Sequence, residues 1–232
     1  MKVTSGVYST KGVRPQNEDS YICNTDNTPN GPMLFAVADG MGGHAAGDVA
    51  SQFVVKALKD FTTSNSDVVT GDSLEALLKR IHNNLLEEGK KRGTPNMGTT
   101  ITGIVLQDGE CGIFNVGDSR TYRLRNGILQ QLSRDDSLAS IVPDAAKNII
   151  TNALGAGLNT ITVQQRFSKN IAVPGDLFFM CSDGVHGAID DDGLAEMLEN
   201  GGSLDDIAKT IVEKAIENGS DDNCTAVIVR IE

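Results

Sequence analysis

Residues 99–132 have the sequence TTITGIVLQDGECGIFNVGDSRTYRLRNGILQQL, in which strand-like runs alternate with turn-forming residues. The runs cover residues 99–106, 111–116, 120–124 and 128–132. They are separated by Asp108-Gly109, Gly117-Asp118 and Asn126-Gly127, and such dipeptides favour tight turns between antiparallel strands. The stretch therefore predicts an antiparallel meander, not repeated strand–helix–strand units.

Strands and helices are also expected on both sides of this meander. Apolar runs predict further strands over residues 2–8, 33–38, 161–167, 177–181 and 225–231. Three- and four-residue spacing of apolar side chains predicts helices over residues 45–61, 72–91 and 203–218, and a further helix is expected near residues 145–154. Helices segregated from antiparallel strands define the α+β class. Because no linker or repeat interrupts residues 1–232, we expect a single domain.

Composition and charge exclude several classes of function. The chain has 232 residues, of which 39% are hydrophobic and 22% charged, and this balance is typical of a globular protein with a real core. The net charge of -11 disfavours nucleic acid and anionic membranes as partners. Four scattered cysteines without a CxxC pair indicate free thiols in a reducing compartment. With no N-terminal leader and no apolar stretch of about 18 residues, we expect a cytoplasmic protein.

Four aspartates lie beside predicted strands, and three of them are next to glycine. They are Asp39, Asp118, Asp183 and Asp222. A single Asp-Gly pair is a common turn, so only the four aspartates taken together indicate a site. Carboxylates that converge near an apolar core are unfavourable unless they are paired or bound to metal. Oxygen ligands without histidine or cysteine at ligand spacing favour Mg²⁺ or Mn²⁺, and two such ions about 4 Å apart can activate a shared water.

Three other sequence features suggest chemistry only weakly. Residues 40–45, GMGGHA, fit a dinucleotide-binding loop, but Asp39 at its mouth would repel a pyrophosphate and the fold lacks βαβ repetition. Cys224 and Arg230 have the spacing of cysteine phosphatases, yet the residues between them favour a strand where a phosphate-binding loop would be needed. His82 is expected on the exposed face of a helix, and His186 in a loop near Asp183.

Six short motifs, in this order, resemble those of the metal-dependent protein serine/threonine phosphatases, the PPM or type 2C family. The first is residues 12–19 (GVRPQNED), and the second is residues 38–44 (ADGMGGH), which resembles the bacterial type. The later motifs are residues 97–100 (MGTT), 115–120 (NVGDSR), 181–185 (CSDGV) and 221–225 (DDNCT). The resemblance spans nearly the whole chain, and six motifs in order are far more specific than any one.

The resemblance implies a fold and a cofactor. The fold is a four-layer α-β-β-α sandwich, in which two mainly antiparallel sheets are flanked by helix pairs. The cofactor is Mn²⁺ or Mg²⁺, with two ions in a core site and a third that binds more weakly. Glu18 or Asp19 would reach the second core ion directly or through water, and Asp118 with Asp183 would hold the third.

The resemblance also implies a mechanism. Asp39 would bridge the two core ions, Asp183 and Asp222 would complete the first site, and the Gly40 carbonyl would join the second. Arg14 would bind the substrate phosphate, because a forked guanidinium suits that anion. A hydroxide bridging the two ions would attack phosphorus directly, without a covalent intermediate. The expected catalytic residues are therefore Arg14, Asp39 and Asp183.

Two departures from the family pattern affect this prediction. Met41 stands where some members have a histidine that is proposed as the general acid. The acid that protonates the leaving group is then either His44 or a metal-bound water, and we favour the water because a histidine that opens a helix is more often a capping or surface residue. Residues 135–148 correspond to the family's flap and are short, which predicts a different substrate selection.

The resemblance finally implies a function and partners. The chain would hydrolyse phosphoserine and phosphothreonine in proteins that a serine/threonine kinase has modified, and it would act as a monomer. The alternative is a non-catalytic pseudophosphatase that regulates a protein partner through the same fold. Such a protein would lack one or more metal carboxylates, whereas all are present here. A phosphatase for small phosphoesters also stays open.

Overall fold

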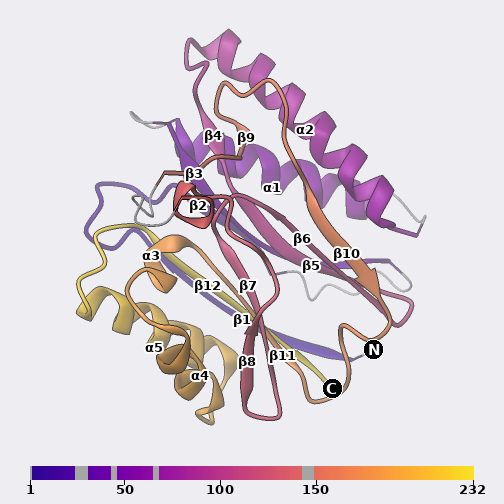
Figure 1. Cartoon of the computed structure of the whole chain (residues 1–232), viewed down its shortest axis with the longest axis vertical. Helices are drawn as coiled ribbons and strands as arrows, with labels where there is room; N and C mark the ends of the chain where they lie inside the picture. Colours follow the sequence, from indigo (N-terminus) through magenta and orange to yellow (C-terminus); the bar gives the residue numbers. More distant parts are fainter. Residues whose placement is uncertain (1, 24–30, 43–45, 65–67, 143–148) are drawn as a thin grey trace.

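The computed structural model describes residues 2–23, 31–42, 46–64, 68–142 and 149–232. Two antiparallel sheets pack face to face, and helices cover both outer faces (Figure 1). This arrangement confirms the predicted four-layer α-β-β-α sandwich. Among the described residues, every helix is too short or too polar to cross a bilayer.

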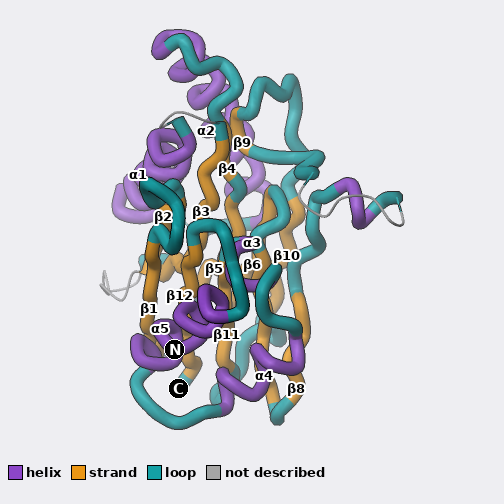
Figure 2. The backbone as a smooth tube through the Cα atoms, turned by 90° about the vertical axis from the view of Figure 1, so that its left-hand side faces the viewer, coloured by secondary structure: helices purple, strands orange, loops and turns teal. Residues whose placement is uncertain are grey.

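The five-stranded sheet has the order β1-β12-β11-β7-β8, and all its pairs are antiparallel. Its strands are β1 (Val3–Thr10), β7 (Arg120–Arg125), β8 (Ile128–Gln131), β11 (Leu177–Cys181) and β12 (Cys224–Ile231). Val3 pairs with Ile231, so the two termini lie side by side at one end of the sheet (Figure 2).

The seven-stranded sheet has the order β10-β6-β5-β3-β4-β9, and β2 pairs with β3 beside this path. Its strands are β2 (Asp19–Cys23), β3 (Met33–Met41), β4 (Gly98–Thr99), β5 (Ile101–Gln107), β6 (Glu110–Val116), β9 (Leu154–Gly155) and β10 (Gln164–Ser168). The register places Asp19 of β2 opposite Asp39 of β3.

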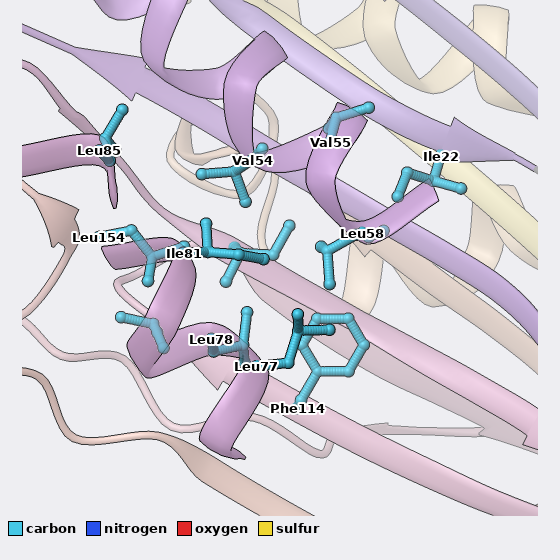
Figure 3. Close-up of a cluster of buried hydrophobic side chains, with 14 of the residues drawn as sticks. Ile22, Val54, Val55, Leu58, Leu77, Leu78, Ile81, Leu85, Phe114 and Leu154 are labelled. Atoms are coloured by element: carbon cyan, nitrogen blue, oxygen red, sulfur yellow. The ribbon is translucent and has the colours of Figure 1, made fainter. Parts of the chain in front are cut away.

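Two long helices cover the seven-stranded sheet. They are α1 (Gly47–Ser64) and α2 (Gly71–Arg92), and their apolar faces enclose a cluster with β3, β5 and β6. Figure 3 shows Val54 and Leu58 of α1 and Leu78 and Ile81 of α2 on either side of this cluster, with Phe114 below them. The apolar side chains whose spacing predicted both helices are therefore the ones that the helices bury.

Shorter helices cover the five-stranded sheet. They are α4 (Asp191–Glu199) and α5 (Leu204–Glu217), preceded by the single turn α3 (Asp183–His186), and a 3₁₀ turn, η1 (Leu138–Ser140), lies elsewhere. Ser203 caps α5, accepting a hydrogen bond from the Asp206 amide at 3.1 Å. A third apolar cluster lies between the sheets and includes Phe35, Ile104 and Phe178.

The meander prediction is wrong at one point. β5 pairs with β6 and β7 pairs with β8, but β6 and β7 belong to different sheets. The chain crosses from one sheet to the other at residues 117–119. A turn dipeptide shows that the chain reverses, but it does not show which layer the next strand joins. That choice is made by packing between the sheets.

Other local predictions also need correction. β3 continues through Asp39 to Met41, beyond the strand predicted over residues 33–38, because β4 pairs with Gly40 and Met41. The short elements β2, α3 and α4 were not predicted. In the helix expected near residues 145–154, residues 149–154 are not helical, and residues 143–148 lie outside the described residues.

Candidate metal centre

Asp39 occupies the centre of a group of carboxylates at one end of the sandwich. Its backbone is held firmly: the Asp39 amide donates to Thr100 Oγ1 at 3.0 Å, and its carbonyl accepts from the Thr100 amide at 2.9 Å and from Thr99 Oγ1 at 2.8 Å. Its side chain keeps some accessible surface, but the atoms around the carboxyl group exclude most of the water. The strand therefore fixes where this carboxylate stands.

Three further carboxylates reach Asp39 from distant parts of the chain. Burial raises the pKa of Asp39 well above its ordinary value, and the charges of Asp19, Asp183, Asp118 and Asp222 raise it further, in that order. Asp183 opens α3, Asp118 lies in the turn between the two sheets, and Asp222 lies just before β12. The structure thus brings together the four aspartates that lie beside predicted strands and Asp19, which the family resemblance had also implicated.

Burial and mutual repulsion make the charged form unfavourable for several of these carboxyl groups. Burial raises the pKa of Asp118 to about 7, and the charge of Asp183 adds to the effect. Burial also raises the pKa of Asp19 to about 7, although hydroxyl donors from Thr225 and Ser182 oppose the shift. For Asp183, burial and then the charge of Asp222 raise the pKa. Each group is destabilised as an anion by its surroundings.

Three oxygens of this group lack hydrogen-bond partners. Oδ1 of Asp19, Oδ1 of Asp118 and Oδ1 of Asp183 are buried, and each meets no donor within the part of the chain that the structure describes. Orphaned buried oxygens are rare in folded proteins and call for a ligand. A divalent cation with oxygen preference supplies what these atoms lack.

Glu18 and Gly40 provide oxygens on the other side of Asp39. A Cβ at Gly47 would lie 2.8 Å from both Glu18 Oε2 and the Gly40 carbonyl oxygen, so only glycine leaves this space open. Glu18 is held in place because its amide donates to Asn223 Oδ1 at 2.8 Å and its carbonyl accepts from the Gly40 amide at 3.2 Å. The geometry thus supports the pairing of Glu18 with Gly40.

Side chains alone do not complete a coordination sphere. Among the described residues, no three carboxylate, imidazole or thiolate groups converge tightly enough to ligate one ion. Mg²⁺ and Mn²⁺ usually keep several waters and bind through one or two carboxylates. The shortage of side-chain ligands therefore fits these ions and excludes a closed cage of protein side chains within the described residues.

Arg14 lies at the rim of the carboxylate group. Its Nη2 donates to Asp222 Oδ2 at 2.9 Å, and its Nε donates to the Asp221 carbonyl at 2.7 Å. Its side chain is about half exposed, so part of the guanidinium faces solvent. A phosphate that approached the carboxylates would therefore meet a forked cation.

The two described histidines differ from expectation. His186 lies in α3, not in a loop, and its Nε2 is 3.0 Å from the Asp118 carbonyl oxygen. Burial and then the charge of Arg120 lower the pKa of His186 to about 4, so the ring is neutral at pH 7 and donates its Nε2 proton to that carbonyl. His82 is buried, not exposed, and its Nδ1 accepts from the Gly155 amide at 3.0 Å. His44 lies outside the described residues.

Residues that support the ligands were missed at the sequence level. Asn223 joins the Glu18 segment to β12, because its Nδ2 donates to the carbonyls of Lys11 and Gln16. Ser182 and Thr225 donate to Asp19 Oδ2 at 2.8 and 2.7 Å. The only local sign of these roles is that small polar residues stand next to the motif aspartates.

Comparison with known proteins identifies the family. Residues 13–222 match the family described as Protein phosphatase 2C. The serine/threonine phosphatase Stp of Listeria monocytogenes is 31% identical, over 94% of this chain and 91% of Stp. The serine/threonine protein phosphatase PstP of Mycobacterium tuberculosis is 33% identical, over 94% of this chain and 43% of PstP. A crystal structure of the PstP catalytic domain with two manganese ions superposes with a TM-score of 0.85 at 30% identity and covers 99% of both chains.

Proposed function

The chain belongs to the protein phosphatase 2C family, and from this premise we propose which of its residues bind cations and phosphate and which proteins it acts on. It is a metal-dependent protein serine/threonine phosphatase that uses Mn²⁺ or Mg²⁺. Nothing in the carboxylate group favours a pseudophosphatase, because every expected acid is present and lies near Asp39.

The core of the proposed site is Asp39 with the carboxylates around it. Asp39 would be shared by the two ions, and Asp183 and Asp222 would complete the first ion's protein ligands. To do so these carboxylates would have to lie closer together than they do here, since no three such groups among the described residues converge on one point. The Gly40 carbonyl would bind the second ion, with Glu18 beside it; this choice is supported by the space that Gly47 leaves open between Glu18 Oε2 and the Gly40 oxygen.

The periphery of the site involves Asp19 and Asp118. Asp19 commits Oδ2 to two hydroxyl donors, so only its Oδ1 is free to act, directly or through a water, on the second ion. Asp118 and Asp183 would hold a third and weaker ion. The free Oδ1 atoms of both residues support this assignment.

Bound divalent cations supply Lewis acidity and an activated water nucleophile for phosphoryl hydrolysis. The chain's own residues orient the substrate. Arg14 presents its guanidinium to the phosphate, and its contact with Asp222 places it next to the ligands. Asp39 and Asp183 are assigned as catalytic because they would hold the cations whose positive charge the reaction requires. The enzyme forms no covalent bond to phosphorus.

Protonation of the leaving group falls to water in this proposal. Met41 ends β3 and carries no exchangeable side-chain proton. His186 is neutral and uses Nε2 to hold the Asp118 carbonyl, so it is not free to act as the acid. The serine or threonine alkoxide therefore takes its proton from a water in the site.

Phosphoproteins are the substrates of this chain. We infer further that these are targets of a serine/threonine kinase, and that the chain works as a cytoplasmic monomer with residues 1–232 forming one domain. The net charge of -11 supports the absence of nucleic-acid and membrane partners.

The observation that carries the proposal is the set of buried, unpartnered Oδ1 atoms around Asp39. The test is hydrolysis of a phosphothreonine peptide with Mn²⁺, with and without chelator, beside Asp39→Asn. We expect chelator to abolish turnover, and Asp39→Asn to lower kcat/KM about a thousandfold, or about 4 kcal/mol. The matched control is Asp60→Asn, which removes an exposed carboxylate of α1 that pairs with Lys56. Turnover that survives chelator, or full activity in Asp39→Asn, would refute the mechanism.

A further inference from the structure

The turn that carries Asp118 depends on support from outside. β6 ends at Val116 and β7 begins at Arg120 in the other sheet. Gly117 has a φ of 109°, and a Cβ there would lie 2.6 Å from Thr100 Cγ2. The turn therefore requires a glycine. Glycine is conformationally permissive, so other residues must hold the turn in one shape.

Asp136 bonds to both backbone groups of Gly117. Its amide donates to the Gly117 carbonyl at 3.0 Å, and the Gly117 amide donates to Asp136 Oδ2 at 3.0 Å. The carboxylate also accepts from Asn152 Nδ2 at 2.7 Å and from Gln164 Nε2 at 3.0 Å. An ionised carboxylate accepts up to about four hydrogen bonds, whereas an asparagine offers one acceptor atom. Three donors therefore specify an aspartate here.

Two other side chains also bond to the backbone of this turn. His186 Nε2 donates to the Asp118 carbonyl at 3.0 Å, and Asn115 Nδ2 donates to the Gly117 carbonyl at 2.9 Å. His186 belongs to the helical turn that starts at Asp183. The helical turn that begins at Asp183 therefore also helps to hold the backbone of Asp118 in place.

Asp136 also closes the neck of the loop between residues 137 and 150. The Thr151 amide donates to the Asp136 carbonyl at 2.8 Å, and the Leu138 amide donates to the Ile149 carbonyl at 2.8 Å. One residue therefore joins the base of this loop to the Asp118 turn. None of these contacts was visible in the sequence, where Asp136 follows the similar Asp135.

We propose that Asp136 is a positioning residue, which holds Asp118 where it binds the weakest divalent cation together with Asp183. The inference rests on the proposed function, because that function places Asp118 and Asp183 at this ion. Asp136 acts through the Gly117 backbone and not as a ligand. Residues that orient metal ligands through hydrogen bonds typically alter metal affinity about 10- to 100-fold.

The test is a Mn²⁺ titration of Asp136→Asn by isothermal calorimetry, with amide hydrogen exchange measured by NMR. We expect the weakest Mn²⁺ site to lose affinity about tenfold or more, while the two tighter sites change less than about twofold. We also expect the Gly117 amide to exchange faster, because its acceptor is weakened. The matched control is Asp176→Asn, which removes a buried carboxylate at the opposite end of the sandwich. It should lose stability and keep all three affinities.

The outcomes separate this inference from the proposed function. An unchanged weakest site in Asp136→Asn would overturn the inference, and so would a wild-type chain that binds only two ions. Equal loss at all three sites would also overturn it, because that pattern indicates a general folding defect. A wild-type chain that neither binds Mn²⁺ nor hydrolyses the phosphopeptide would instead contradict the proposed function.

Discussion

Two aspartates flank β11, and the protein treats them in opposite ways. Asp176, just before the strand, is 1% exposed and accepts from Nε and Nη2 of Arg125, both at 2.6 Å. Asp183, just after the strand, has a buried Oδ1 that meets no donor in the described ranges, and the charge of Asp222 adds to the burial that raises its pKa. Asp176 is neutralised by a paired arginine, whereas Asp183 has no such ion pair among the described residues.

This difference shows that the fold can neutralise a buried carboxylate where only stability is at stake. The bidentate contact of Arg125 does so at Asp176. At the other end, several carboxylates lie near one another without a matching set of basic residues among the described residues, so their repulsion is relieved by protons or by cations. Such sites gain function and lose stability, as is common in enzymes. Four measurements test whether the two ends of β11 differ in this way.

The largest effect is expected from Asp183→Asn. Loss of this ligand should lower kcat/KM on a phosphothreonine peptide about a thousandfold, or about 4 kcal/mol. In chelator, the same change should raise the free energy of unfolding, because it removes one of several mutually repelling charges. Urea unfolding and steady-state kinetics on the same preparation measure both. Activity within tenfold of wild type would contradict the assignment of Asp183.

The converse is expected from Asp176→Asn. Breaking a buried pair leaves Arg125 without its partner and should lower the free energy of unfolding by about 3 kcal/mol. Activity per folded molecule should stay within about twofold of wild type, since Asp176 lies at the far end of β11 from Asp183. A loss of activity without a loss of stability would show that the two ends are not independent.

The third prediction concerns pH in the absence of metal. The pKa values of Asp19 and Asp118 in the folded chain are each raised to about 7, above their ordinary value of 3.8. The folded state therefore binds these protons more tightly than the unfolded state, so stability falls as pH rises between about 4 and 7. The two groups together should contribute a loss of about 5 kcal/mol from pH 5 to pH 8 in chelator. With saturating Mn²⁺, thermal scans should show this slope flattened or reversed; an unchanged slope would argue against cation binding here.

The smallest effect is expected from Arg14→Lys. Lysine keeps the charge but cannot present a fork to the phosphate, so KM should rise about tenfold, or about 1.4 kcal/mol, with kcat changed less than about threefold. The matched control is Arg92→Lys, because Arg92 pairs with Glu88 on the surface of α2. Equal kinetics for the two variants would remove Arg14 from the phosphate site.

Much of the fold followed from local patterns. The spacing of Val54 and Leu58 in α1, and of Leu78 and Ile81 in α2, predicted the helical faces that the structure buries. The position of Asp118 and Asp222 beside strands was also correct. The predictions that failed concern features set by residues distant in sequence. These are the change of sheet after β6, the extension of β3 to Met41 by its pairing with β4, and the burial of His82.

The candidate site divides in the same way. Ligand types were predictable because chemistry is a property of residue identity, and carboxylates beside apolar strands favour hard cations. Their support was not predictable. Asn223 binds the Glu18 amide across 205 positions of sequence, and the choice between Glu18 and Asp19 depends on the space that Gly47 leaves beside Glu18 Oε2 and the Gly40 oxygen.

Residue order and chemistry were enough to predict the class of the fold and the candidate oxygen ligands with their order along the chain, because periodicity and residue chemistry are local properties. Only the tertiary structure decided which oxygens remain without partners. Asp19 receives its two hydroxyl donors from residues 163 and 206 positions away, and the Gly117 amide receives its acceptor from Asp136 across the change of sheet. Hydrogen bonds saturate, so the atoms left over for a cation are known only after every distant segment has been placed.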